Sequence, residues 1–245
     1  MKTISFLLIP LVLFSACQSS GNKSSKKNKD SSLQKTSTMN TNTSEAWISL
    51  FNGKNLDGWR GFKNHPTDAW NVENGTLHCN GHIEGAAHTD LITDSSFKDF
   101  AFTIKWKISP ESNSGIMFHV TEDQPHTYLT GPEYQIIDDQ GWPGDLEDWQ
   151  HTGSNYAMQV PDSAHVNPVG EWNTTKIVVE DAHVSHWLNG DKILEYTLWS
   201  PEWKKQKAAG KWKEVASYGM SKSGHIALQY HGGDVWFKDI KIRKL

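Results

Sequence analysis

Apolar and polar residues alternate along most of the chain after residue 45, as in β-strands with one buried face. The clearest stretch is 100–108, where Phe, Ile and Trp take the even positions and Ala, Thr and Lys the odd ones. Asn-Gly pairs at 74–75 and 189–190 each separate two strand-like runs, which predicts two-residue hairpin turns. Further strands are predicted at 46–51, 115–120, 133–138, 174–180, 225–231 and 235–243.

Ten or more short strands between turn signals predict an all-β fold, a sandwich or a barrel. One helical insertion interrupts this pattern. Ser200 is a good N-cap, Pro201 suits the first turn, and Glu202 favours the positive end of a helix. We expect this helix to run towards Ser217, although Gly210 weakens its middle. Residues 45–245 are therefore predicted to form one domain.

The first 44 residues have a different pattern. Residues 1–17 contain a basic start and an apolar run at 4–14, the layout of a secretory signal peptide, and they end in Phe-Ser-Ala-Cys. This ending resembles the lipobox of bacterial lipoproteins, in which the cysteine, here Cys17, is diacylated and anchors the protein. The alternative is an ordinary signal peptide with an incidental cysteine. Residues 18–44, rich in Ser, Thr, Asn and Lys, predict a flexible linker.

These segments predict a protein of the cell envelope that is held to the membrane by a lipid anchor. Gln18 directly after the cysteine favours the outer membrane, on its periplasmic side. Residues 45–245 carry 18 Lys and Arg against 27 Asp and Glu. Because this acidic domain repels phosphate backbones, nucleic acid is excluded as a partner. Cys79 is the only other cysteine, so there is no disulfide framework, and we expect it to be a small packing residue.

Candidate chemistry lies on three strands, opposite their apolar faces. Period two places polar side chains there, where a curved sandwich could gather them in one concavity, although each alone is typical of a solvated surface. These residues are His119 in 115–120, Glu133 and Gln135 in 133–138, and Gln229 and His231 in 225–231. His119, Glu133 and His231 are also the candidate ligands of a possible divalent metal, and no other cofactor is indicated.

The segment 138–156 is crowded with Gly, Pro, acidic and aromatic residues. A connection this long within a compact domain predicts a binding loop or lid. Twelve Trp in the chain suit sugar binding, since indole rings stack on the C–H faces of sugars. The alternative is that Trp residues such as Trp106 and Trp236 fill the core.

Five motifs occur in an order that resembles the 3-keto-disaccharide hydrolase family, over about residues 46–245. The resemblance implies a concanavalin A-like jelly-roll β-sandwich and a carbohydrate substrate, a glycoside already oxidised to a ketone at C3. The motifs are Leu-Phe-Asn-Gly-Lys-Asn-Leu-Asp-Gly-Trp at 50–59, Asn-Ser-Gly-Ile at 113–116, Gly-Pro-Glu-Tyr-Gln-Ile-Ile-Asp at 131–138, His-Trp-Leu-Asn-Gly at 186–190 and Gly-His-Ile-Ala-Leu-Gln-Tyr-His-Gly at 224–232.

The C3 ketone acidifies the C2 proton, so a base can remove it and the C1 oxygen can leave; water then adds to complete a net hydrolysis. The resemblance implies that Glu133 and His231 are base and acid, in either order. Further substrate contacts are expected from Asn113, His119, Gln135, Gln229 and Tyr156, with Asp138 and His186 as second choices. His186 shares a strand face with Val184 and Leu188, so a core histidine is an equal alternative.

Two other functions remain open. One is a carbohydrate-binding lipoprotein without catalysis, and the other is a conventional glucanase-type glycoside hydrolase. The glucanase needs two carboxylates that flank the anomeric carbon. The outward positions contain one clear carboxylate, Glu133, which favours elimination chemistry. The sequence leaves open the glycoside, its linkage, the metal requirement and the oligomeric state.

Overall fold

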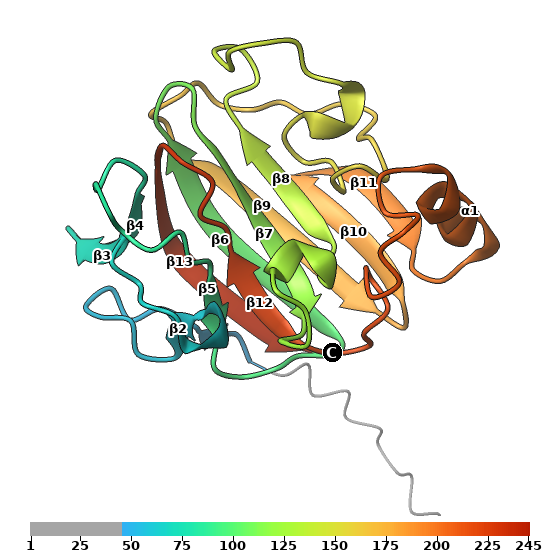
Figure 1. Cartoon of the computed structure of the whole chain (residues 1–245), viewed down its shortest axis with the longest axis horizontal. Coiled ribbons are helices and arrows are strands. Elements are labelled where there is room, and N and C mark those ends of the chain that lie inside the picture. The colour runs from blue at the N-terminus through green and yellow to red at the C-terminus, as the bar shows by residue number, and fades with distance from the viewer. Residues whose placement is uncertain (1–45) are drawn as a thin grey trace, which may run out of the picture. The chain divides into compact units, whose positions relative to one another are not determined.

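A computed structural model describes residues 46–245, whereas the predicted signal peptide, Cys17 and the predicted linker lie outside the described residues (Figure 1). Within the described part, one α-helix, α1 (Pro201–Ala209), accompanies three 3-10 helices, η1 (Phe62–Asn64), η2 (Thr127–Leu129) and η3 (Asp148–Gln150). No helix there is long and apolar enough to cross a membrane. The strands are β1 (Ile48–Ser49), β2 (Trp59–Gly61), β3 (Trp70–Glu73), β4 (Thr76–Asn80), β5 (Leu91–Thr93), β6 (Phe100–Ile108), β7 (Asn113–Val120), β8 (Glu133–Ile137), β9 (Asn173–Glu180), β10 (His183–Leu188), β11 (Asp191–Thr197), β12 (His225–Leu228) and β13 (Asp234–Lys244).

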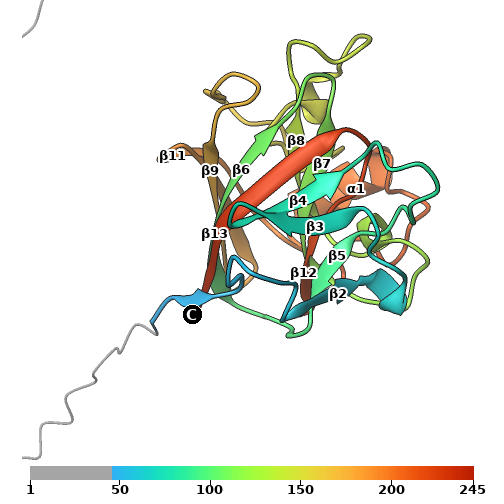
Figure 2. The ribbon, with the colours of Figure 1, turned by 90° about the vertical axis from the view of Figure 1, so that its left-hand side faces the viewer.

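The strands form two antiparallel sheets that pack face to face as a sandwich (Figure 2). The larger sheet has the order β11-β10-β9-β6-β13-β4-β3, with β1 paired to β13. The smaller sheet has the order β2-β5-β12-β7-β8. The predicted all-β sandwich with one helical insertion is therefore confirmed.

The core lies between the sheets and follows the alternation read from the sequence. Along β6 every apolar side chain at an even position is buried. Trp106 is fully buried, and its Nε1 donates to Thr175 Oγ1 at 2.9 Å, so the indole loses no hydrogen bond on burial. Cys79 is buried as a packing residue, as predicted. The expectation that Trp236 fills the core is wrong, because it lies half-buried on the outer face and stacks on His78.

Other differences concern element ends and very short strands. The helix begins as predicted, with Ser200 Oγ accepting from Trp203 N at 3.1 Å. It ends at Ala209, not near Ser217, because Gly210 leaves the helical conformation. The three-residue strands β2 and β5 were not predicted, since three residues are too few to show a period. The strand predicted at 225–231 ends at Leu228.

Candidate active site

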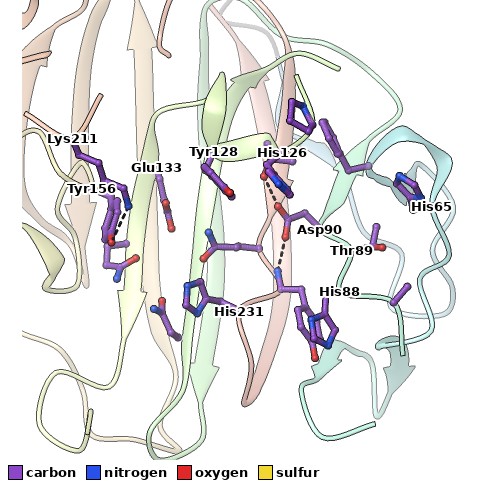
Figure 3. A pocket seen from close by; sticks show the side chains of 18 of the residues that line it. His65, His88, Thr89, Asp90, His126, Tyr128, Glu133, Tyr156, Lys211 and His231 are labelled. Carbon is purple, nitrogen blue, oxygen red and sulfur yellow. Dashed lines mark hydrogen bonds between the residues drawn. The ribbon is translucent and has the colours of Figure 1, made fainter. Parts of the chain in front are cut away.

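A cavity of about 690 Å³ opens on the face of the smaller sheet that is turned away from the larger sheet. Its floor is formed by β7, β8 and the residues that follow β12, and its walls by loops from far apart in the sequence (Figure 3). The walls come from 87–90 before β5, from 125–128 around η2, and from 211–212 after α1. This volume lies within the range of pockets that enclose small ligands.

Glu133 and Gln135 lie at the floor of the cavity, as period two along β8 predicts. Both are almost fully buried, with 4% and 1% of their surfaces exposed. Gly115 pairs opposite Gln135, and a Cβ added to Gly115 would lie 2.2 Å from Glu133 Oε1. The glycine of the Asn-Ser-Gly motif therefore leaves the space in which the Glu133 carboxyl lies.

Two amide side chains line the same floor. Asn113 comes from β7, and Gln229 follows β12, where its backbone N–H donates to Gly115 O at 3.0 Å. The side-chain oxygens Asn113 Oδ1 and Gln229 Oε1 are buried and have no hydrogen-bond partner. An unpaired buried acceptor costs free energy, which a ligand hydroxyl would recover by donating to it.

Two carboxyl groups with different electrostatic environments face the cavity (Figure 3). Burial, together with the neighbouring charge of Asp90, raises the pKa of Glu133 to about 8, against the opposing effects of Lys211 and Gln229. Burial raises the pKa of Asp90 to about 6. Hydrogen bonds from the Thr127 hydroxyl and, at 2.8 Å, from Tyr230 N favour its charged form. Near neutral pH, Glu133 therefore holds a proton while Asp90 is ionised.

An aromatic wall and a cation close one end of the cavity. Lys211 Nζ lies 3.4 Å from Tyr156 Oη and 4.4 Å from the centre of its ring. It lies 5.0 Å from the ring of Trp212. His231 lines the same cavity and is exposed to solvent. Six of the predicted site residues thus line this one cavity, namely Asn113, Glu133, Gln135, Tyr156, Gln229 and His231.

His119 does not join them, so its predicted position is wrong. Between the pairs Met117–Ala227 and Val120–His225, β7 carries one residue more than β12, which makes a β-bulge. His119 has φ of +53° at this bulge, so the alternation of faces is lost after Phe118. Its Nε2 lies 2.8 Å from Lys98 O, beside a separate small cavity. The metal triad of His119, Glu133 and His231 is not assembled, and residues 46–245 contain no group of three or more His, Cys, Asp or Glu suited to a metal.

Asp138 and His186 also lie away from the cavity. The Asp138 carboxylate accepts from the backbone N–H groups of Glu111 at 2.9 Å and Gly141 at 2.8 Å, so it holds two loops together. His186 is fully buried between the sheets, with Nδ1 2.9 Å from Gly153 O, and burial lowers its pKa to about 4. It is a core histidine. Of the segment 138–156, only Tyr156 lines the cavity, so this segment is not its lid.

Several cavity residues were missed by the sequence analysis. Asp90 precedes the short strand β5, and Lys211 follows α1 among other lysines, so neither stands in a periodic pattern. Their only sequence signal is a polar residue at the end of an element. The remaining missed polar residues of the cavity are His65, His88, Thr89, His126, Thr127, Tyr128 and Tyr230.

Known proteins with similar sequences and folds include enzymes that act on carbohydrates. Residues 46–243 match the family model of the 3-keto-alpha-glucoside-1,2-lyase-like domain. A 3-keto-disaccharide hydrolase of Bacteroides thetaiotaomicron is 31% identical over 229 residues, which are 82% of this chain and 79% of that protein. A solved structure of a candidate glycosyl hydrolase from Parabacteroides distasonis ATCC 8503 is 40% identical, with a TM-score of 0.76, and the match covers 81% of this chain and 94% of that one.

A more distant structure bears on the fold alone. It is a Bacillus subtilis protein of unknown function with a galectin-like fold, 12% identical with a TM-score of 0.51. The match covers 81% of this chain and 94% of that chain. The two-sheet architecture therefore has the jelly-roll character expected from the sequence.

Proposed function

The chain belongs to the family of 3-keto-alpha-glucoside-1,2-lyase-like domains, and from this premise we propose that it cleaves glycosides whose sugar carries a ketone at C3. Cleavage of a glycosidic bond is the part that the family relationship supports directly. The requirement for the ketone, and the elimination that the ketone makes possible, are the finer parts of the proposal.

The observation that carries the proposal is the buried carboxyl of Glu133, whose pKa burial raises to about 8, in one cavity with two unpaired amide oxygens. A protonated carboxyl is an acid ready to donate to a leaving oxygen. The amide oxygens of Asn113 and Gln229 are placed to accept from sugar hydroxyls. Together these groups suit a polar, uncharged ligand with several hydroxyl groups.

The proposed reaction divides the proton transfers between two residues. His231 takes the C2 proton, and the electron pair of that bond forms an enolate with the C3 ketone. The enolate then expels the C1 oxygen, which takes the proton of Glu133, and a C1–C2 double bond forms. Water adds to C1 and a proton returns to C2 when the net result is hydrolysis. Lys211, whose charge reaches Glu133, stabilises the negative enolate oxygen.

The second carboxyl of the cavity does not favour a conventional glycosidase. A retaining enzyme needs one free carboxylate as nucleophile and a second carboxyl as acid. Both oxygens of Asp90 are already engaged, one by the Thr127 hydroxyl and the other by Tyr230 N. Asp90 is therefore better suited to raise the pKa of Glu133 than to attack a sugar carbon.

The direct test compares two substrates that differ only at C3. The full chain is incubated with a 3-keto-glucoside and with its unoxidised parent, with and without a chelator. We expect cleavage of the keto sugar alone, and chelator sensitivity decides whether a divalent metal takes part. Equal cleavage of the parent would indicate a conventional glycosidase, whereas binding without cleavage of either sugar would indicate a carbohydrate-binding protein.

We also propose that Cys17 is acylated and anchors the protein in the cell envelope, on the periplasmic side of the outer membrane. The support is the lipobox-like Phe-Ser-Ala-Cys at 14–17 and the signal-like residues before it. Metabolic labelling with a radioactive fatty acid should mark the wild-type protein but not Cys17→Ser. Release of the wild-type protein into the soluble fraction would contradict the proposal.

A further inference from the structure

The outer face of the larger sheet is basic and aromatic. Along β13, buried Phe237, Ile240 and Ile242 alternate with basic residues that point away from the core. The neighbouring strands β6 and β9 add lysines at the positions between their buried residues. The basic side chains of this face are Lys105, Lys107, Lys176, Lys238, Lys241 and Arg243.

Tryptophan rings lie between these cations, and all of them are partly or largely exposed. A cation placed over the face of an indole is attracted by the ring. Five such pairs occur: Lys176 Nζ is 3.5 Å from the ring centre of Trp187, Lys238 Nζ is 3.9 Å from Trp172, Lys107 Nζ is 4.5 Å from Trp236 and 5.5 Å from Trp172, and Arg243 Cζ is 5.3 Å from Trp47. We call this surface the basic face.

The positive charge of the basic face is only partly balanced. Lys105 pairs with Asp239 at 2.8 Å, and Glu73 accepts a hydrogen bond from Trp236 Nε1. Among the described residues, Lys176 has no acidic partner that shifts its pKa: burial lowers this pKa, and the nearby positive charge of Arg243 lowers it as well. Residues 45–245 carry nine more acidic than basic residues, so this face is positive on a domain that is negative as a whole.

The chain enters the domain at this face. β1 pairs with β13 through Ile48 and Ile242 and through Ser49 and Lys241, and Trp47 lies against Arg243. Only 28 residues separate Ala46 from Cys17. A chain of that length cannot extend beyond about 100 Å. A lipid on Cys17 would therefore tether the domain to the membrane through β1, which pairs with β13 of the basic face.

The candidate active site lies on the other side of the sandwich. Its floor is the outward face of the smaller sheet, and the basic face is the outward face of the larger sheet. A surface that covers the basic face therefore leaves the cavity open to solvent.

We propose that the basic face docks on an anionic phospholipid surface. Its lysines and Arg243 meet the headgroup phosphates, and its indole rings lie at the level of the headgroups, where tryptophan is favoured. The inference rests on the proposed membrane anchoring at Cys17, and it does not depend on the proposed reaction.

The test measures binding to vesicles by the full chain with Cys17→Ser, which lacks the anchor. One vesicle contains phosphatidylglycerol and phosphatidylethanolamine, and the other contains only phosphatidylcholine. We expect sedimentation with the anionic vesicle at low ionic strength, little with the neutral one, and loss of binding in high salt. Equal binding to both vesicles, or to neither, would overturn the proposal.

Two triple variants of that protein show whether binding depends on the basic face or only on the net charge of the domain. Lys107→Ser, Lys176→Ser and Lys238→Ser together should weaken binding on the order of 100-fold, since each surface lysine contributes about fivefold. Lys204→Ser, Lys205→Ser and Lys213→Ser remove the same charge from exposed positions in and after α1 and should change binding by less than about threefold. Equal losses in both triples, or binding to an acidic polysaccharide without binding to vesicles, would overturn the proposal. Cleavage of a soluble keto-glycoside should be unchanged in both triples, so a failure of the reaction proposal would be seen separately.

Discussion

The buried carboxyl of Glu133 should make the protein less stable as the pH rises, and Glu133→Gln should remove this effect. Its pKa is about 8 in the folded protein, against an ordinary value of 4.5. The folded state therefore holds the proton more tightly than the unfolded chain does. The resulting penalty is absent below pH 4.5, grows between pH 4.5 and 8, and is constant above pH 8.

The size of the effect follows from these two values. Each pH unit between them corresponds to about 1.4 kcal/mol. Between pH 5 and pH 9, wild-type protein should lose on the order of 4 kcal/mol of unfolding free energy from this one group. The glutamine keeps the shape of the side chain, does not titrate, and replaces the protonated carboxyl by another hydrogen-bond donor.

The assay is urea unfolding of both proteins at pH 5, 7 and 9. The variant should be close to wild type at pH 5 and more stable by several kcal/mol at pH 9, while its activity is lost. A difference between the two proteins that stays constant from pH 5 to pH 9 would refute the assignment of Glu133 as a buried, protonated acid.

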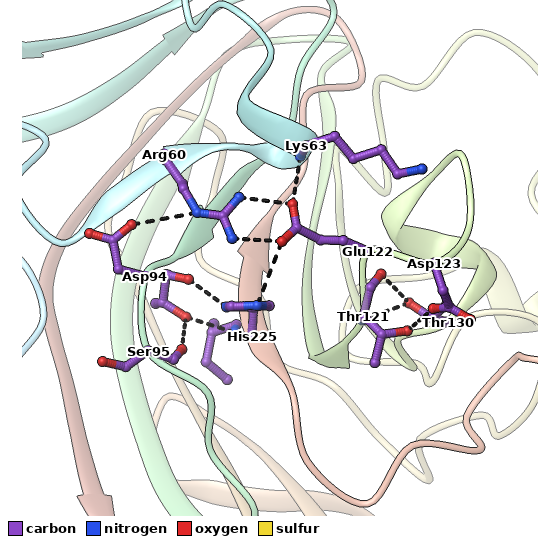
Figure 4. Close-up of polar contacts among 11 residues, drawn as sticks. Arg60, Lys63, Asp94, Ser95, Thr121, Glu122, Asp123, Thr130 and His225 are labelled. Carbon is purple, nitrogen blue, oxygen red and sulfur yellow. Dashed lines mark hydrogen bonds and ion pairs between the residues drawn. The ribbon is translucent and has the colours of Figure 1, made fainter.

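The remaining predictions concern the rate, the glycine below Glu133, a surface carboxylate and the cation at the cavity wall. If Glu133 is the acid, kcat/KM should fall as the pH rises through about 8; a fall on the acid side of pH 8 would make it the base. Gly115→Ala should lower kcat/KM at least 100-fold without unfolding the protein, because its Cβ would displace the Glu133 carboxyl; near-normal kinetics would contradict this. Glu122 forms a bidentate pair with Arg60 (N–O distances 2.8 and 2.6 Å), which holds its pKa at about 2 (Figure 4). The stability that this ion pair contributes is fully present above pH 4.5, the ordinary pKa of the carboxyl, and is lost as the pH falls through 2. Glu122→Gln should therefore lower the free energy of unfolding, measured with urea, by about 1 kcal/mol at pH 7 and by less at pH 3. Its effect has the opposite sign to that of Glu133→Gln, which raises the free energy of unfolding. Lys211→Met should lower kcat more than it raises KM if its charge stabilises the enolate, and an effect on KM alone would argue against that role.

The fold was largely predictable because its strands are long enough to show their period. The limits of β6 are those predicted from the alternation at 100–108, and both Asn-Gly pairs stand at two-residue turns between paired strands. The two shortest strands of the smaller sheet could not be found in this way. Each has three residues, all at least half-buried, which is too few to show an alternation of buried and exposed positions.

The site was predictable only where the period holds. Glu133 and Gln135 lie where the alternation along β8 places them, but the extra residue at His119 reverses the faces within a single strand. No local sequence pattern predicts that bulge, because it depends on how β7 pairs with β12. Asp90 and Lys211 reach the cavity from loops, and only the packing of loops over the smaller sheet brings them near Glu133.

The central claim is that the C2 proton leaves during cleavage, and the most direct measurement follows that proton. The full chain is given a 3-keto-glucoside in D2O, and the product is read by NMR at early times, with a sample lacking enzyme as the blank for spontaneous exchange. Elimination followed by addition of water predicts a 3-keto sugar with deuterium at C2, or an unsaturated product with no hydrogen there. A product that keeps its original hydrogen at C2 would contradict the account, because direct hydrolysis leaves that bond intact.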